Sequence, residues 1–226
     1  MADYTGPVPE TELRRWVEDQ ITRGAGEHAR GYQGAVYRYQ GSGADLIIKV
    51  AAGSGLRAWL GRRFLAREWR AYQALQGFAS VPRAHGLIAG RYLVLDFVPG
   101  RPLFQAELSD RAGFFRRLRV AIEDMHARGV AHGDLQKRDN LFVTETGEPR
   151  LLDFGTAIVR RRGWAPLNHY LFRFVSRMDL HIWLKHKYRG DFHALAPEDR
   201  GCYHMPWVFR FAAATKRLSR GLRRRD

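Results

Sequence analysis

The segment 132–155 constrains the fold of this chain most strongly, because it holds two acidic clusters that are each joined to a short apolar run. The first cluster reads HGDLQKRDN and continues into LFV, and the second reads LLDFG. Gly147 and Pro149 lie between them and favour a turn, so the two runs are predicted to form a β-hairpin. Carboxylate and amide oxygens at strand ends suit Mg²⁺, which shares its coordination sphere with substrate phosphates. The segment therefore predicts a site that handles phosphate groups.

A glycine-containing loop precedes this segment. Residues 29–36 read ARGYQGAV and match the pattern G-x-G-x-x-G-x-V in every fixed position except the first, which Ala29 occupies. Gly31 and Gly34 would let backbone N–H groups approach phosphates closely, and Val36 completes the pattern. An ordinary hairpin turn between two strands is the alternative interpretation.

A lysine and a glutamate lie where apolar residues are expected. Lys49 interrupts the apolar run 45–51, which is predicted to be a strand. Glu68 falls on the apolar stripe of a helix predicted over 56–75. Because an unpaired buried carboxylate is costly, Glu68 needs a cation, and Lys49 is the nearest unusual candidate. A solvent-facing Lys49 at a sheet edge is the alternative.

In their order, these elements resemble the protein-kinase-like superfamily: a glycine loop, a strand lysine, a helix glutamate, a catalytic loop and an Asp-Phe-Gly segment. The resemblance covers about residues 28–160. It implies an α+β, bilobal fold, with an antiparallel-sheet N-lobe over 1–98 and a short, mainly helical C-lobe over 99–226. The C-lobe has no readable A-P-E signature, and it is more similar to compact bacterial lipopolysaccharide-core (Kdo or heptose) kinases and to RIO-type atypical kinases.

The resemblance also implies a role for each candidate residue. Asp134 would orient the attacking hydroxyl and accept its proton, and Lys137 would neutralise the γ-phosphate. Asn140 and Asp153 would hold Mg²⁺, for which Mn²⁺ could substitute. His132 is expected to pack under the Asp-Phe-Gly segment rather than to take part in the chemistry. The implied ATP-binding residues are Gly31, Gly34, Val36, Lys49, Glu68, Asp96 and Val98.

The catalytic loop departs from the family pattern in two ways. Five residues separate Asp134 from Asn140, where the family has four. The apolar run follows Asn140 directly, which favours one inserted residue with Asn140 as the metal ligand, and Asp139 is the alternative ligand. Gly133 stands where many protein kinases have an arginine that reads phosphorylation of the activation loop, which argues against that switch here.

The rest of the chain supplies strands and helices around these motifs. Strands are predicted over 85–89 and 91–98, and the end of the second resembles the hinge that holds adenine through backbone groups, which is why Asp96 and Val98 are in the ATP-binding set. Ser109 is predicted to cap a helix over 110–128.

A long or broken helix is predicted over 168–188. Asp179 in this helix is interpreted as a solvated residue. The alternative is the acidic residue that many kinases place under the catalytic loop.

Net charge indicates the kind of partner. The chain carries 38 Lys and Arg residues against 23 Asp and Glu residues, a net charge of +15. Anionic lipid headgroups, phosphorylated substrates and nucleic acid are all attracted by such a charge, and nucleic acid is the least favoured of them. The basic amphipathic segment 207–225 either lies on an anionic membrane face or packs as a helix with a solvated end.

Location is predicted from what the sequence does not contain. Neither a secretory signal pattern nor an apolar run near the ~20 residues that span a bilayer is readable, which predicts a cytoplasmic protein. Peripheral contact with the inner face of the membrane is a second option. The single Cys202 excludes an internal disulfide and gives no support for a zinc site.

The predicted function is ATP-dependent transfer of the γ-phosphate to a hydroxyl, on a lipopolysaccharide-core sugar or a similar cell-envelope acceptor. One alternative is a RIO-type serine/threonine protein kinase. Another is a pseudokinase that serves as a binding module for anionic surfaces. The missing first glycine and the extra loop residue favour the pseudokinase, whereas the presence of Lys49, Glu68, Asp134, Asn140 and Asp153 argues against it.

Overall fold

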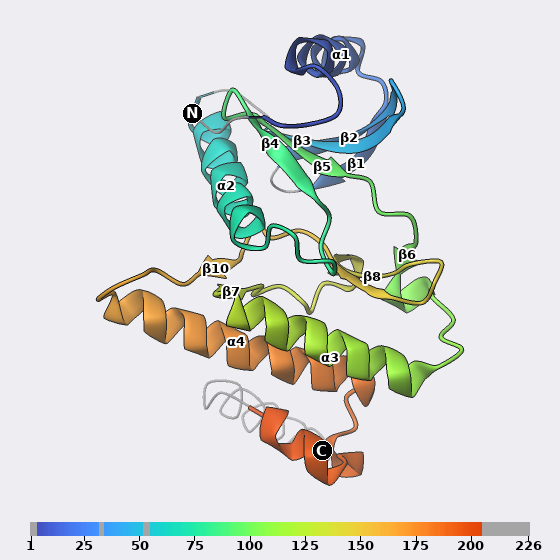
Figure 1. Cartoon of the computed structure of the whole chain (residues 1–226), viewed down its shortest axis with the longest axis vertical. Helices are drawn as coiled ribbons and strands as arrows, with labels where there is room; N and C mark the ends of the chain where they lie inside the picture. The colour runs from blue at the N-terminus through green and yellow to red at the C-terminus, as the bar shows by residue number, and fades with distance from the viewer. Residues whose placement is uncertain (1–3, 32–33, 52–54, 205–226) are drawn as a thin grey trace, which may run out of the picture.

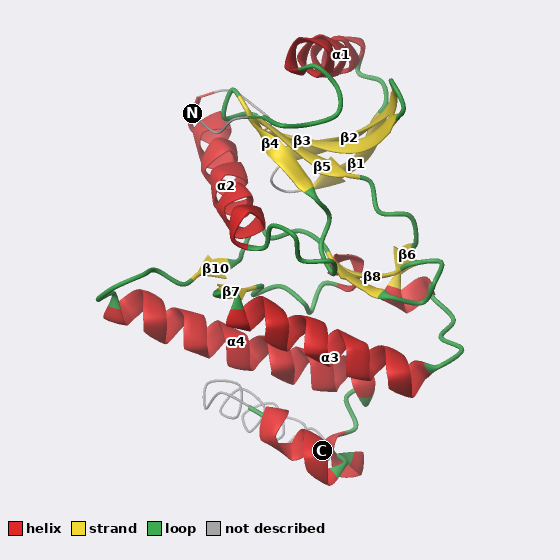
Figure 2. Ribbon diagram, viewed as in Figure 1, coloured by secondary structure: helices red, strands yellow, loops and turns green. Residues whose placement is uncertain are grey.

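The computed structural model describes residues 4–31, 34–51 and 55–204, and it has the predicted α+β, two-lobed architecture. Figure 1 shows a sheet with one helix on either side of it, above a second layer in which two long helices lie side by side. Figure 2 shows that strands dominate the first of these layers and helices the second. The candidate site residues come from both layers.

A five-stranded antiparallel sheet forms the N-terminal part, in the order β1-β2-β3-β5-β4. Its strands are β1 Glu27–Gly31, β2 Gly34–Gly41, β3 Ala44–Ala51, β4 Ala84–Ile88 and β5 Tyr92–Asp96. Helix α1 (Glu10–Arg23) packs Leu13 and Val17 on one face of the sheet. Helix α2 (Gly55–Ala74) packs on the other face through Leu65 and Tyr72.

The alternation of side chains along β3 determines which face receives the lysine. Leu46, Ile48 and Val50 are buried in the cluster that includes α1. Ile47 and Ala51 pack in the other cluster, together with residues of α2. Because successive strand residues point to opposite faces, Lys49 lies on the α2 side of the sheet.

The C-terminal part is built on two helices, α3 (Arg111–Ala127) and α4 (Pro166–Lys187). Helix α3 buries an apolar stripe of Phe114, Leu118, Ile122 and Met125. Helix α4 is continuous and begins with Pro166 in its first turn, a position that does not need a backbone donor. In the described part of the chain, no helix is long and apolar enough to cross a membrane.

The cap predicted for α3 is wrong by one residue. Asp110, not Ser109, is the N-cap, and its Oδ1 accepts a hydrogen bond of 2.7 Å from the N–H of Gly113. Both residue types cap helices well, and a carboxylate gains additionally from the positive end of the helix dipole. The choice between two adjacent capping residues depends on where the chain turns into the helix.

Short elements connect the two layers. Strands β6 (Arg101–Pro102), β8 (Leu141–Val143) and β9 (Pro149–Leu151) form a small sheet, and β8 and β9 are the predicted hairpin. Strand β7 (Val130–Ala131) pairs with β10 (Ile158–Val159). The remaining short elements are four 3₁₀ turns, η1 Leu103–Gln105, η2 Arg138–Asn140, η3 Phe192–Ala194 and η4 Pro197–Cys202, among the described residues.

Candidate active site

The strand lysine and the helix glutamate form an ion pair. The Nζ of Lys49 lies 2.5 Å from Oε1 of Glu68, and Glu68 is only 1% exposed. The predicted pairing is therefore confirmed, and the solvent-facing alternative for Lys49 is wrong. The pair forms because β3 directs Lys49 toward α2 and the apolar stripe of α2 directs Glu68 toward the sheet.

Asp153 joins this pair from the second layer. Its Oδ1 lies 3.2 Å from the Nζ of Lys49, and its Oδ2 lies 3.5 Å from the Nζ of Lys137. Burial disfavours the carboxylate, but the attraction of Lys49 and Lys137 outweighs it, so the pKa of Asp153 is lowered. Its backbone has a φ of +65°, a left-handed conformation that few non-glycine residues adopt. The structure thus holds an ionised carboxylate between two lysines.

Lys49 is also held in its charged form. Burial works against the ammonium group, but the attraction of Glu68 and Asp153 is stronger, and the pKa of Lys49 is raised. Lys49 therefore stays protonated at neutral pH. A fixed cation beside an ionised carboxylate suits a site that receives both phosphate oxygens and a metal ion.

The catalytic loop is held by an aspartate of α4. The carboxylate of Asp179 accepts hydrogen bonds from the backbone N–H groups of His132 (2.8 Å) and Gly133 (2.9 Å), and it lies 3.0 Å from Nε2 of His126. Asp179 is 2% exposed, so its interpretation as a solvated residue is wrong and the alternative is right. Two successive N–H groups at this turn, one of the buried His132 and one of Gly133, meet a single side chain, and Asp179 supplies one carboxylate oxygen to each.

His132 fastens the catalytic loop to the Asp-Phe-Gly segment. Its Nε2 donates to the carbonyl of Leu152 (2.9 Å), and its Nδ1 accepts from the N–H of Asp134 (3.3 Å). Its ring centroid lies 4.7 Å from that of Phe154. Because the ring is fully buried, the pKa of His132 is lowered, and the neutral form fits both hydrogen bonds. The predicted packing position of His132 is confirmed.

Asn140 lies beside Asp134. Its Nδ2 donates to the backbone carbonyl of Asp134 (2.9 Å) and lies 3.4 Å from Oδ2 of the same residue. The side chain is buried, whereas Asp139 is exposed in the turn η2, which accommodates the extra loop residue. Because Nδ2 is used in these contacts, the side-chain oxygen is the atom of Asn140 that could hold a metal ion, and its position beside Asp134 favours Asn140 over Asp139 as the candidate ligand.

Asp153 and Asn140 together offer one carboxylate and one amide oxygen as possible metal ligands, which is typical of a site where phosphate supplies further ligands. Among the described residues, no group of three or more His, Cys, Asp and Glu side chains could hold a metal ion by itself. A site with one carboxylate and one amide needs further oxygens from the substrate, which is how Mg²⁺ is commonly bound beside phosphates. Asp153 and Asn140 fit that requirement.

The glycine loop is described only in part. Strands β1 and β2 pair antiparallel with Gly31 opposite Gly34, and residues 32 and 33 lie outside the described residues. In the neighbouring pair of strands, β2 and β3, Val36 is directly opposite Lys49. Residues opposite each other in an antiparallel pair share a face, so Val36 lies on the same side of the sheet as Lys49.

The structure does not bring the side chain of Asp96 to this centre. Asp96 ends β5, and its Oδ1 lies 2.5 Å from Nε2 of His85. Its N–H donates to the carbonyl of Arg83 (2.9 Å). Asp96 and Val98 line a cavity of about 1110 Å³, which Lys49 and Asp153 do not line. The carboxylate of Asp96 is thus occupied by His85 and is not directed at Lys49 or Asp153.

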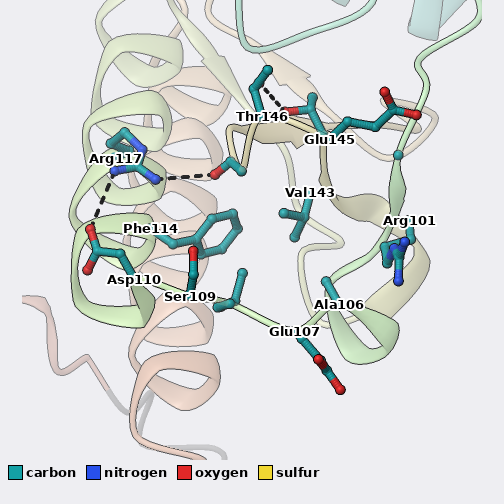
Figure 3. Close-up of a pocket in the computed structure, with 14 residues that line it drawn as sticks. Arg101, Ala106, Glu107, Ser109, Asp110, Phe114, Arg117, Val143, Glu145 and Thr146 are labelled. Carbon is teal, nitrogen blue, oxygen red and sulfur yellow. Dashed lines mark hydrogen bonds and ion pairs between the residues drawn. The ribbon is translucent and has the colours of Figure 1, made fainter.

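A second cavity, of about 430 Å³, also lies away from the charged centre. Figure 3 shows that its wall carries Arg117, which is held by Asp110 and by the carbonyl of Gly147 at 3.2 Å. None of the predicted site residues lines this cavity. Arg117 joins α3 to the β8–β9 turn, and the cavity has no part in the candidate site.

Sequence reasoning missed Arg67. This residue of α2 donates to the carbonyls of Ala157 (2.8 Å) and Thr156 (3.0 Å), directly after the Asp-Phe-Gly segment. Its neighbour Glu68 holds Lys49, so adjacent residues of α2 fix both parts of the site. An arginine on a helix rich in arginines carries no distinguishing signal in the sequence.

Comparison with known proteins agrees with this geometry. No family model matches the chain. CBL-interacting protein kinase 25 of Oryza sativa subsp. japonica is 30% identical over 170 residues, which cover 69% of this chain and 32% of the relative. CBL-interacting protein kinase 16 of the same organism is 30% identical over 143 residues, or 59% of this chain and 30% of the relative. Maternal embryonic leucine zipper kinase of Danio rerio is 30% identical over 157 residues, or 66% of this chain and 23% of the relative.

The fold, the paired lysine and glutamate, and these distant homologues together support the protein-kinase-like superfamily. The relatives are named protein kinases, which supports a phosphotransferase. The chain spans about a third of the length of these relatives or less. Their names do not extend to the lipopolysaccharide-core or RIO types.

Proposed function

We propose that this chain is an ATP-dependent kinase that transfers the γ-phosphate to a hydroxyl group. The observation that carries the proposal is the contact of Asp153 with both Lys49 and Lys137, where Lys49 is itself paired with Glu68. Phosphoryl transfer depends on positioning and on neutralising negative charge, and this centre supplies two cations and a metal-binding carboxylate.

Each residue then has a role. Lys49, held by Glu68, binds the α- and β-phosphates. Asp153 and Asn140 hold Mg²⁺ or Mn²⁺, and that ion, when bound, neutralises charge on the phosphates. Lys137 is 50% exposed, so its side chain is free to move from Asp153 to the γ-phosphate.

Asp134 is the proposed base for the acceptor hydroxyl. Its carbonyl and its carboxylate both face the amide of Asn140, so this one amide positions the proposed base relative to the proposed metal ligand. A base must lie within hydrogen-bond reach of the proton that it accepts, and the partly buried Asp134 is open enough for an acceptor to reach.

The nucleotide is proposed to lie under the β1–β2 hairpin. Gly31 and Gly34 would cover the phosphates with backbone N–H groups, and Val36 would contact the base from the same face as Lys49. Val98 and Asp96 would contact adenine through backbone groups at the junction of the proposed lobes, 1–98 and 99–226.

We propose a lipopolysaccharide-core sugar or a similar envelope molecule as the acceptor, at a cytoplasmic site with peripheral membrane contact. Only ten residues, 156–165, separate the Asp-Phe-Gly segment from α4, which leaves little chain for docking a peptide. A RIO-type serine/threonine protein kinase is the second candidate. The basic segment 207–225, proposed as one membrane contact, lies outside the described residues.

ATP turnover by the purified chain with Mg²⁺ tests the proposal. Labelled γ-phosphate should move to a glycolipid fraction in preference to a protein fraction, and Asp153→Asn should abolish the transfer. Transfer to protein alone would favour the RIO-type candidate. If the wild type neither consumes ATP nor gains thermal stability with ATP and Mg²⁺, the chain is a pseudokinase and the kinase proposal fails.

A further inference from the structure

The first half of α4 exposes large apolar side chains to solvent. Four of them lie at positions i, i+3, i+4 and i+7 of the helix and so share one face, and the fifth, Trp164, lies two residues before the helix begins. We name this set the α4 apolar face: Trp164 (93% exposed), Leu167 (71%), Tyr170 (62%), Leu171 (40%) and Phe174 (40%). In Figure 1, the first turns of α4 project past the end of α3. Four large apolar residues on one helix face, with a further exposed tryptophan just before them in the chain, indicate an interaction surface.

The same stretch of chain is strongly basic. No acidic residue occurs from 154 to 178. The next acidic residue, Asp179, is buried and occupied by the N–H groups of the catalytic loop, so it does not neutralise the surface. Five exposed arginines lie in the same stretch as the apolar face, three before α4 and two within it, and we name them the arginine rim: Arg160, Arg161, Arg162, Arg173 and Arg177.

The positive charge around the α4 apolar face limits which partner could cover it. The segment 205–226 of the same chain carries seven Lys and Arg residues and one Asp, so it would bring positive charge against the arginine rim. A second copy would oppose one arginine rim with another. Like charges brought together on a surface repel, and both occupants are therefore disfavoured.

An anionic bilayer matches both parts of the surface. Leu167, Leu171 and Phe174 would enter the boundary of the acyl chains, whereas Trp164 and Tyr170 suit the headgroup level because each has an apolar body and a polar tip. The arginine rim would contact lipid phosphates, and each basic residue near such a surface adds to the affinity. An acidic protein would satisfy the arginines but would not require so large an apolar face.

We infer that the α4 apolar face and the arginine rim form a docking surface for an anionic lipid bilayer, with α4 lying along the membrane. This surface is distinct from the basic segment 207–225 and does not depend on catalysis. Asp179 lies on the inner side of the same helix, so docking would hold the catalytic loop close to the membrane surface.

The test compares two leucines in the full-length chain. Leu167 in α4 and Leu56 in α2 are both 71% exposed and both lie near the start of a helix, so Leu167→Glu and Leu56→Glu change charge and exposure equally. Sedimentation is measured with vesicles of phosphatidylcholine containing phosphatidylglycerol, and with phosphatidylcholine alone. Leu167→Glu should lower the partition coefficient on anionic vesicles at least tenfold, and Leu56→Glu should leave it within about twofold.

A second variant tests the rim. Arg161→Gln combined with Arg173→Gln should weaken binding to anionic vesicles tenfold or more, with a smaller loss at high salt, because salt already screens the charges that are removed. Thermal stability and ATP turnover on a soluble acceptor should not change in either variant. Turnover thus separates failure of docking from failure of the proposed activity.

Several outcomes would overturn the inference. One is a wild-type chain that does not sediment with anionic vesicles. Another is equal loss of binding in Leu167→Glu and Leu56→Glu, because Leu56 belongs to a separate exposed apolar group of α2 with Trp59 and Leu60, and equal loss would show that binding is not specific to α4. A third is a dimeric wild type that becomes monomeric in Leu167→Glu while vesicle binding is unchanged, which would make the face a contact between copies.

Discussion

The charged centre around Asp153 and the α4 apolar face reverse the usual placement of side chains in opposite ways. At the centre, charged groups are paired and are buried or partly buried; on α4, apolar groups are exposed in a stretch rich in arginines. Buried charges are expensive unless they are paired, and exposed apolar patches are uncommon in monomers. Both departures are typical of binding sites, and we propose different ligands for them: a phosphate with its metal at the first, and an amphipathic surface at the second. Variants in the two regions should therefore affect different measurements.

The largest expected effect is on turnover at the charged centre. Asp153→Asn and Asp134→Asn should each lower kcat at least ~100-fold, because each removes an interaction that acts mainly in the transition state. Circular dichroism and thermal melting should show that the fold is kept. Near-normal turnover in either variant would show that its assigned role is wrong.

A change in the support of the catalytic loop should appear as lost stability. Asp179→Ala leaves two N–H groups of the loop without their acceptor and should cost about 3 kcal/mol of unfolding free energy. Asp179→Asn keeps one acceptor oxygen and should cost less. Urea unfolding measures both, and an equal loss in the two variants would contradict the role of the carboxylate in accepting these bonds.

The inserted loop residue gives a smaller and more selective effect. Asn140→Ala should raise the concentration of Mg²⁺ needed for half-maximal turnover about tenfold or more, whereas Asp139→Ala should change it little. Titration of turnover with Mg²⁺ distinguishes the two. The opposite order would make Asp139 the ligand.

The pH dependence of stability should report His132. Burial lowers its pKa in the folded state, so below its usual value of about 6.5 the unfolded state binds more protons than the folded state. Stability should therefore fall as the pH drops from about 7 toward 5. In His132→Phe this dependence should weaken by up to about 1.4 kcal/mol per pH unit. An unchanged slope in urea unfolding at several pH values would assign the dependence to other groups.

The smallest effect should come from the α4 apolar face. Leu167→Glu replaces a side chain that is already exposed, so the free energy of unfolding should change by no more than about 0.5 kcal/mol. Thermal melting checks this. A loss above about 2 kcal/mol would mean that Leu167 is packed in solution, and the contrast between the two regions would disappear.

Sequence reasoning succeeded where a charged residue does not fit the apolar pattern of its own segment. Lys49 in an apolar strand and Glu68 on an apolar helix stripe are each anomalous, and one ion pair explains both. The hairpin β8–β9 follows from turn residues between two apolar runs.

The sequence could not show features that depend on tertiary packing. Asp179 looks like any polar helix residue until the catalytic loop is placed against it. Helix α4 has apolar residues on more than one face, so periodicity alone does not tell that Phe172 is buried and Phe174 exposed. Arg67 is one of several arginines on α2, and its contacts depend on where the chain passes after Gly155.

The short segment between the Asp-Phe-Gly motif and α4 is anchored along its length. Arg67 binds its first carbonyls, the pairing of β10 with β7 holds its middle, and Asn168 binds the N–H of Arg161 (2.7 Å) and the carbonyl of Val159 (3.1 Å). A segment with this many anchors has little disorder to lose, so attaching a phosphate there would gain little. We therefore expect the rate of phosphate transfer by this chain to depend on how close it lies to its acceptor, and not on phosphorylation of this segment.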